Sequence, residues 1–140
     1  MKDRLIAWGP AAAWAGVLFF LSAIPGKDYP STLFPGEDKV AHVGLYAVLG
    51  ALLARGAGPR AADAPRPLAL WAVGFLFAAS DEWHQAFVPG RHMSLGDLAA
   101  DAVGIAVGYW LFTRFLGQRA GPAAAPSSTR PPRPAGPRPE

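Results

Sequence analysis

The sequence predicts an all-α, polytopic membrane protein, a four-helix transmembrane bundle with a disordered C-terminal tail. Four long apolar segments and a charged fraction of only 16%, against about 25% in soluble domains, indicate the membrane class. Beyond residue 118 the chain is crowded with proline and shows no periodic apolar face, which is typical of disorder. We therefore expect one membrane domain over residues 1–118 and a cytoplasmic tail over residues 119–140. The chain has no cysteine, which excludes disulfides, thiol nucleophiles and cysteine-ligated metals.

The first apolar segment, Leu5 to Ile24, has 20 residues and no charge. As a helix, it is long enough to cross the ~30 Å hydrocarbon layer of a membrane. A cleaved signal peptide is the alternative, because Lys2 and Arg4 precede the run. However, the run is longer than the usual apolar core of a signal peptide, and no clean cleavage site follows it. A retained span is the favoured interpretation.

The second and third apolar segments, Val40 to Ala54 and Leu68 to Ser80, are each too short to span a membrane alone. Extending the second from Asp38 or Lys39 to Arg55, and the third to Phe87, gives full-length helices and brings polar residues to the membrane edge. A Pro-Gly pair at residues 89–90 ends the third helix. The fourth segment runs from Leu98 to Leu116. A soluble bundle is the alternative, but the all-round apolar character of the first and fourth segments argues against it.

The distribution of basic residues predicts the orientation of the bundle. With the N-terminus in the cytoplasm, ten Lys and Arg residues lie inside and three lie outside. The inner ones are Lys2, Arg4, Arg55, Arg60, Arg66, Arg114, Arg119, Arg130, Arg133 and Arg138, and the outer ones are Lys27, Lys39 and Arg91. Because cytoplasmic loops carry the excess of Lys and Arg, we expect both termini inside the cytoplasmic (inner) membrane of a bacterial cell.

Polar residues gather at the outer ends of the predicted second, third and fourth helices. The expected binding residues are Asp38, Lys39, His42, Tyr46, Asp81, Glu82, Gln85, Arg91, Ser94, Asp97 and Asp101. Ser94 is also expected to cap the fourth helix. Ionisable groups at membrane depth are costly and are functional candidates by default, although purely structural ion pairs are the alternative. Two cations face at least five carboxylates here, so either some carboxyls are protonated or a cation binds.

These residues also resemble a known family. The pattern has three parts: Asp38, Lys39, His42, Tyr46 and Leu49; then Asp81, Glu82, Gln85, Phe87, Pro89, Gly90, Arg91, Ser94 and Asp97; then Gly104 and Gly108. It is similar to the VanZ-like family of bacterial membrane proteins, named for an accessory protein associated with low-level teicoplanin resistance. The resemblance covers roughly residues 38–108 and implies a role at the cell envelope.

One position departs from the family pattern. Asp101 stands where the family usually has an asparagine before the first glycine of the fourth helix. An aspartate accepts hydrogen bonds as asparagine does, but donates only when protonated. We therefore expect Asp101→Asn to be tolerated and Asp101→Leu to be damaging.

The sequence supports two functions of different kinds. The first is a non-enzymatic protein that binds a lipid-linked cell-wall precursor, a glycopeptide or a lipid headgroup, with Arg91 and Lys39 holding its phosphate or carboxylate. The second is an intramembrane hydrolase or transferase acting on a lipid-linked substrate, for which the candidate catalytic residues are His42, Asp81, Glu82 and Asp97. Such an enzyme could hold a hard divalent metal through oxygen, but the sequence identifies no cofactor and assigns no metal site.

The expected partners follow from the same pattern. Membrane lipids surround the helices, and the small-residue ridge Gly104-x-x-x-Gly108 is a candidate for a homodimer through the fourth helix. The basic residues lie in loops and in the tail, and no basic helix face is present, so no nucleic-acid partner is expected.

Overall fold

The chain folds into four long helices in the computed structural model, which describes residues 2–28, 34–58, 61 and 66–116. The long helices are α1 (Lys2–Ser22), α2 (Glu37–Ala57), α3 (Arg66–Gln85) and α4 (Leu95–Leu111). A short 3-10 helix, η1 (Gly26–Asp28), follows α1, and a π-helical turn, η3 (Phe112–Leu116), extends α4. No strand occurs in these ranges, so the predicted all-α class and its four helices are confirmed. The predicted tail lies outside the described residues.

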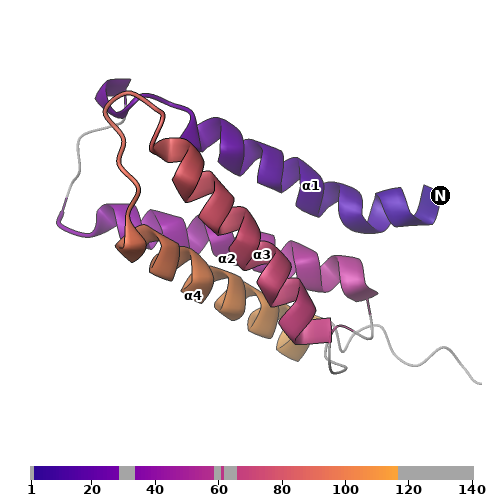
Figure 1. Ribbon diagram of the computed structural model, residues 1–140. Coiled ribbons are helices and arrows are strands. Elements are labelled where there is room, and N and C mark those ends of the chain that lie inside the picture. Colours follow the sequence, from indigo (N-terminus) through magenta and orange to yellow (C-terminus); the bar gives the residue numbers. More distant parts are fainter. Residues whose placement is uncertain (1, 29–33, 59–60, 62–65, 117–140) are drawn as a thin grey trace, which may run out of the picture.

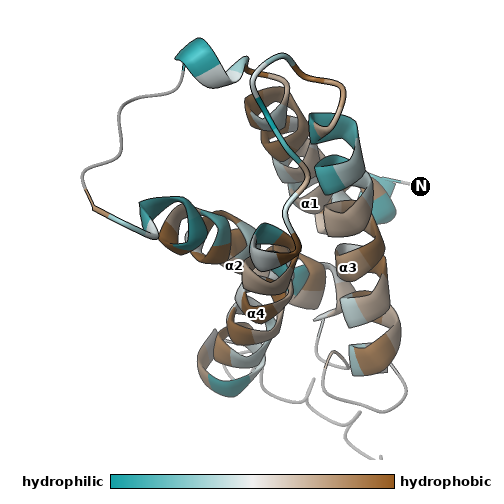
Figure 2. Cartoon of the chain, turned by 60° about the vertical axis from the view of Figure 1, so that its left-hand side comes forward, coloured by the Kyte–Doolittle hydropathy of each residue, from teal (hydrophilic) through white to brown (hydrophobic). Residues whose placement is uncertain are grey.

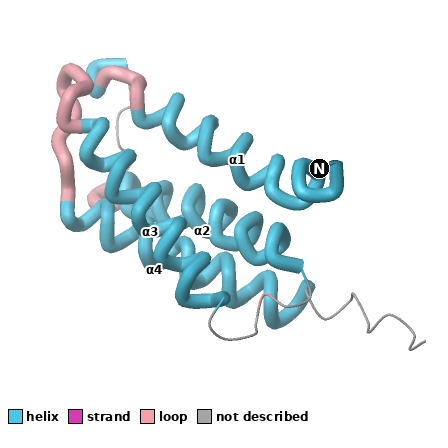
Figure 3. Tube along the Cα trace, turned by 45° about the vertical axis from the view of Figure 1, so that its right-hand side comes forward, coloured by secondary structure: helices cyan, strands magenta, loops and turns pink. Residues whose placement is uncertain are grey.

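The helix order brings four helix ends together. Figure 1 shows that the C-terminal ends of α1 and α3 lie with the N-terminal ends of α2 and α4 at one end of the bundle. Figure 3 places the loops that follow α1 and α3 at this same end. We call it the polar end and define it by residues 22–28, 34–42 and 81–101. A backbone hydrogen bond of 3.0 Å, from the amide of Gly26 to the carbonyl of Pro89, ties the loop after α1 to the loop after α3.

Local signals set the helix boundaries at the polar end. Ser94 caps α4 because its hydroxyl oxygen accepts a 3.2 Å hydrogen bond from the amide of Asp97, as the sequence predicted. α3 ends at Gln85 rather than at the predicted Phe87, because the chain turns at residues 86–88 and forms i to i−3 hydrogen bonds there. Gly90 then adopts a positive φ of 73°, a conformation that suits glycine.

The most extensive packing is between α2 and α4, and small residues permit it. Gly104 and Gly108 of α4 lie against the backbone of Val43 and Ala47 in α2, while Gly50 of α2 lies against the backbone of Ile105. The glycine ridge of α4 is therefore covered within the chain by α2. A homodimer through α4 remains a prediction, but it would have to use a different face of this helix.

The distribution of polar and apolar side chains is the reverse of that in a soluble protein. Phe20 of α1 and Leu76 of α3 are 71% and 66% exposed, whereas Asp81, Glu82 and Asp101 are at most 3% exposed. Figure 2 shows apolar residues along the middle of the helices and hydrophilic ones at their ends, including the polar end. Three helical segments, Lys2–Ser22, Glu37–Ala57 and Leu95–Phe115, are long and apolar enough to cross a membrane. Exposed apolar faces of this extent match a lipid environment.

Candidate functional site

Three carboxylates are buried together at the polar end. Asp81 is 3% exposed, Glu82 1% and Asp101 0%, and Gln85 beside them is 2% exposed. Burial of ionised carboxylates costs several kcal/mol each unless other groups compensate their charge and satisfy their oxygens. Such groups in apolar helices mark functional sites by default. The partners of each carboxylate therefore decide whether its charge and its oxygens are compensated.

Asp81 is fully satisfied by two hydroxyl groups from two other helices. The Ser22 hydroxyl of α1 donates to Asp81 Oδ1 over 2.6 Å, and the Tyr46 hydroxyl of α2 donates to Oδ2 over 3.0 Å. Both donors are themselves buried. Asp81 thus joins α1, α2 and α3 through hydrogen bonds, and this pattern favours a structural and positioning role for it.

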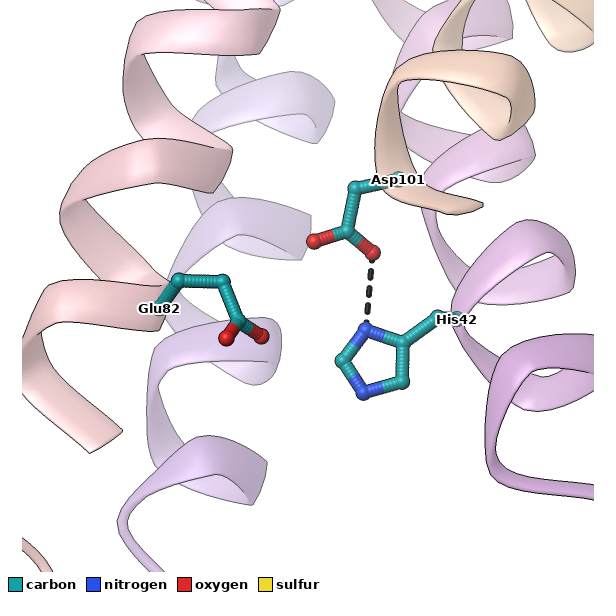
Figure 4. A group of neighbouring side chains, drawn as sticks. All are labelled: His42, Glu82 and Asp101. Atoms are coloured by element: carbon teal, nitrogen blue, oxygen red, sulfur yellow. Dashed lines mark hydrogen bonds and ion pairs between the residues drawn. The ribbon is translucent and has the colours of Figure 1, made fainter. Parts of the chain in front are cut away.

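Glu82 and Asp101 meet His42 on a different side of α3 from the Asp81 contacts. The Nδ1 atom of His42 lies 2.8 Å from Asp101 Oδ1, and because a carboxylate only accepts, the imidazole N–H donates. Glu82 Oε2 accepts the backbone amide of Ser94 over 2.9 Å. One potential ligand atom from each of these three residues lies within 4.8 Å of the other two. Figure 4 shows the two carboxylates and the imidazole facing a common space. We call these three residues the triad.

Further charged residues lie at the exposed rim of the site. Lys39 Nζ contacts Asp38 at 2.9 Å and Asp97 at 3.0 Å, which ties the start of α2 to the start of α4. The Lys39 and Asp38 side chains are about half exposed, so the ion pair between them contributes little stability, whereas the Asp97 side chain is only 15% exposed. Arg91 donates a short hydrogen bond to Gln85 and so fixes the loop after α3 against the buried cluster.

A pocket lies beside the triad, among residues at and next to the polar end. Its polar lining consists of Ser22, His42, Tyr46, Asp81, Gln85 and Arg91. Its apolar lining consists of Leu18 and Leu21 of α1 and Leu45 of α2, and the cavity holds about 30 Å³. Because it is lined by both polar groups and leucines, the pocket suits a small part of an amphiphilic ligand.

Comparison with known families gives one match. A family model described as VanZ/LLP1 matches residues 8–116, which is most of the chain. The chain belongs to the VanZ/LLP1 family. The resemblance inferred from the sequence is thereby confirmed, and the match extends it to include α1. Neither the curated proteins nor the solved structures contain a match to this chain.

Membership of the VanZ/LLP1 family and the three apolar helices together identify a membrane protein. All eleven expected binding residues lie at or next to the polar end, but they divide into separate groups. Asp38, Lys39 and Asp97 form the rim, Tyr46 and Asp81 form the hydroxyl-bonded contact, and His42, Glu82 and Asp101 form the triad. Gln85 and Arg91 line the pocket, and Ser94 contacts Glu82 through its amide.

The structure also changes the set of candidate catalytic residues in this VanZ/LLP1 chain. Asp97 is held at the rim by Lys39, and Asp81 is saturated by hydroxyl groups, so His42 and Glu82 remain the best placed of the four candidates. Asp101, expected only to bind, completes the triad. Ser22 was not expected in the site at all. The one signal in the sequence was that a serine lies at the end of an otherwise apolar run.

Proposed function

We propose that this chain is a four-span protein of the bacterial cytoplasmic membrane that binds a lipid-linked or other cell-envelope ligand at its polar end, outside the cytoplasm. The observation that carries the proposal is the pocket, because it combines buried polar groups with leucine side chains on α1 and α2. A ligand with a phosphate or sugar headgroup and an acyl or prenyl chain likewise combines a polar part with an apolar part. The family's association with teicoplanin resistance accords with an envelope ligand.

The positions of the polar residues in α3 support a fourth span of the membrane by this helix. Over its whole length α3 is less apolar than the other three helices, because Asp81, Glu82 and Gln85 lie near its C-terminal end. These three side chains are buried against neighbouring helices, whereas Leu68, Val73 and Leu76 are more than half exposed. The surface that α3 presents outward is therefore apolar, which supports a fourth span.

The orientation can be tested by labelling single cysteines, because the chain has no native cysteine. Met93→Cys at the polar end should react with a membrane-impermeant maleimide in intact cells, since Met93 is 56% exposed. Lys2→Cys at the opposite end should react only after the membrane is permeabilised, because the excess of basic residues keeps that end inside. The reverse pattern would place the polar end in the cytoplasm and exclude an extracytoplasmic ligand.

Ligand binding can be tested with the purified, detergent-solubilised protein and a polyprenyl-linked cell-wall precursor. Arg91→Gln should weaken binding about tenfold, because a guanidinium lining the pocket can grip phosphate with two hydrogen bonds. The matched control is Arg114→Gln, since Arg114 lies beyond the opposite end of α4. Equal affinities for the wild type and both variants, or no binding by the wild type, would refute the role of the pocket.

An intramembrane hydrolase or transferase is the second candidate, and one contact favours it. His42 is oriented by Asp101 at 2.8 Å, an arrangement that lets an imidazole act as a general base, and Glu82 lies beside it. Incubating the same precursor with the protein distinguishes the two functions. Product formation abolished by His42→Ala and by Glu82→Gln identifies an enzyme, whereas binding without product identifies a recognition protein.

A further inference from the structure

The triad has the composition and spacing of a metal site. It supplies two carboxylates and one imidazole, and a ligand atom of each lies within 4.8 Å of the others. Neighbouring ligands of a tetrahedral metal with ~2.1 Å bonds lie about 3.4 Å apart, and ligands on opposite sides of an octahedral metal lie about 4.2 Å apart. Rotations that bring the three side chains closer together would therefore place all three in coordination. We propose that His42, Glu82 and Asp101 bind one divalent transition-metal ion, Mn²⁺ or Zn²⁺.

Two buried oxygens in the triad independently indicate a missing cationic partner. Glu82 Oε1 and Asp101 Oδ2 have no hydrogen-bond partner among the described residues, although their side chains are 1% and 0% exposed. Figure 4 shows both carboxylates directed toward the space that they share with the imidazole. Buried polar atoms without partners are rare in native structures, and a bound ion can satisfy carboxylate oxygens of this kind.

Charge balance leads to the same conclusion. When both are ionised, the carboxylates of Glu82 and Asp101 carry two negative charges, and the imidazole of His42, which contacts Asp101, can neutralise at most one. The nearby ammonium of Lys39 is engaged at the rim by Asp38 and Asp97. A divalent cation would neutralise both carboxylates and remove the cost of two uncompensated buried charges. The imidazole would then be neutral with its proton on Nε2, so that Nδ1 binds the metal in place of its hydrogen bond to Asp101.

The ligand types restrict the metal. Mg²⁺ and Ca²⁺ prefer ligand sets made entirely of oxygen, whereas Cu⁺ prefers thiolates, and the chain contains no cysteine. A mixed set of imidazole and carboxylates suits Mn²⁺ and Zn²⁺.

His42 also lines the pocket, so a ligand entering there would approach the ion from the His42 side. The proposal stands whether the pocket binds its ligand or also transforms it.

The metal alone tests the proposal, without any organic ligand. The full-length protein, purified through a tag free of histidine and treated with chelator, should bind one Mn²⁺ or Zn²⁺ per chain in calorimetry, and its thermal midpoint should rise. Glu82→Gln and Asp101→Asn keep the side-chain volumes and should each weaken binding at least tenfold, because an amide is a poorer ligand than a carboxylate. Bound Mn²⁺ should also change its electron paramagnetic resonance spectrum.

Asp28→Asn and Asp3→Asn provide the controls, because both carboxylates are exposed and lie outside the triad and the rim. Their affinity for the metal should match that of the wild type. Absence of binding up to millimolar metal by folded wild-type protein would overturn the proposal, as would equal weakening by control and triad variants, which would show adventitious binding to surface carboxylates. Metal binding without precursor binding would contradict the proposed ligand and leave the metal site supported.

Discussion

Replacement of Asp101 by leucine is expected to lower the free energy of unfolding by about 3 kcal/mol, the upper part of the range for leaving a buried hydrogen-bond donor without its partner. Asp101 is fully buried and accepts the Nδ1–H of His42 over 2.8 Å. Leucine offers no acceptor, so the imidazole would lose its partner inside the bundle. It would also place a branched side chain against Glu82.

Asp101→Asn should cost less than about 1.5 kcal/mol, because the amide carbonyl can still accept from His42 and only the charge is lost. The comparison can be made by reversible unfolding in mixed micelles, followed by tryptophan fluorescence. Asp38→Leu is the matched control, because the Asp38 side chain is half exposed and makes only a rim contact, so its loss should be small. Equal destabilisation by leucine and asparagine at position 101 would show that hydrogen bonding there is irrelevant.

The second large effect is expected at the packing of α2 against α4. Gly50→Ala should lower the free energy of unfolding by about 3 kcal/mol, the upper part of the range for overpacking in a tight interface. An added Cβ would lie 2.8 Å from the carbonyl carbon and 2.9 Å from the Cα of Ile105, and backbone atoms cannot rotate away as a side chain can. The two helices would have to separate.

Gly44→Ala is the control for this substitution, because it lies on the same helix and its added Cβ meets nothing within 4 Å. We expect a change of less than about 0.5 kcal/mol there. Gly74→Ala should fall between the two, since its nearest contacts, at 3.2 Å, are side-chain atoms of Ile105 and Leu53 that can adjust. Similar stability of the Gly44 and Gly50 variants would contradict the close approach of α2 and α4.

The helices themselves were largely predictable, because their signals are local. The uncharged run after Arg4 predicted α1, the Pro-Gly pair at residues 89–90 predicted the end of α3, and Ser94 predicted the start of α4. Predicted boundaries differ by a few residues from those observed. At α3 the apolar pattern continues to Phe87, whereas the helix ends at Gln85, where the chain turns toward Arg91.

The direction in which each polar side chain points from its helix was harder to predict. Asp81 and Glu82 are adjacent in sequence, but successive residues on a helix point about 100° apart. Asp81 therefore contacts hydroxyl groups of α1 and α2, while Glu82 contacts the amide of Ser94 and approaches His42. The same difficulty applied to Gly104 and Gly108, whose spacing predicted a close helix contact but not whether that contact lies within the chain or between copies.

By itself the sequence determined that four helices form, because helix length and capping depend on the residues of each segment. It also determined that the polar residues gather at one end, because successive helices run in opposite directions. Only the tertiary structure decided that the hydroxyl groups of Ser22 and Tyr46 donate to Asp81. It also decided that Glu82 and Asp101 lie near His42, each with one buried oxygen that has no partner among the described residues. The hydrogen bonds of Asp81 and Asp101 join residues 35 to 59 positions apart. They depend on the rotation and separation of packed helices, which no single segment encodes.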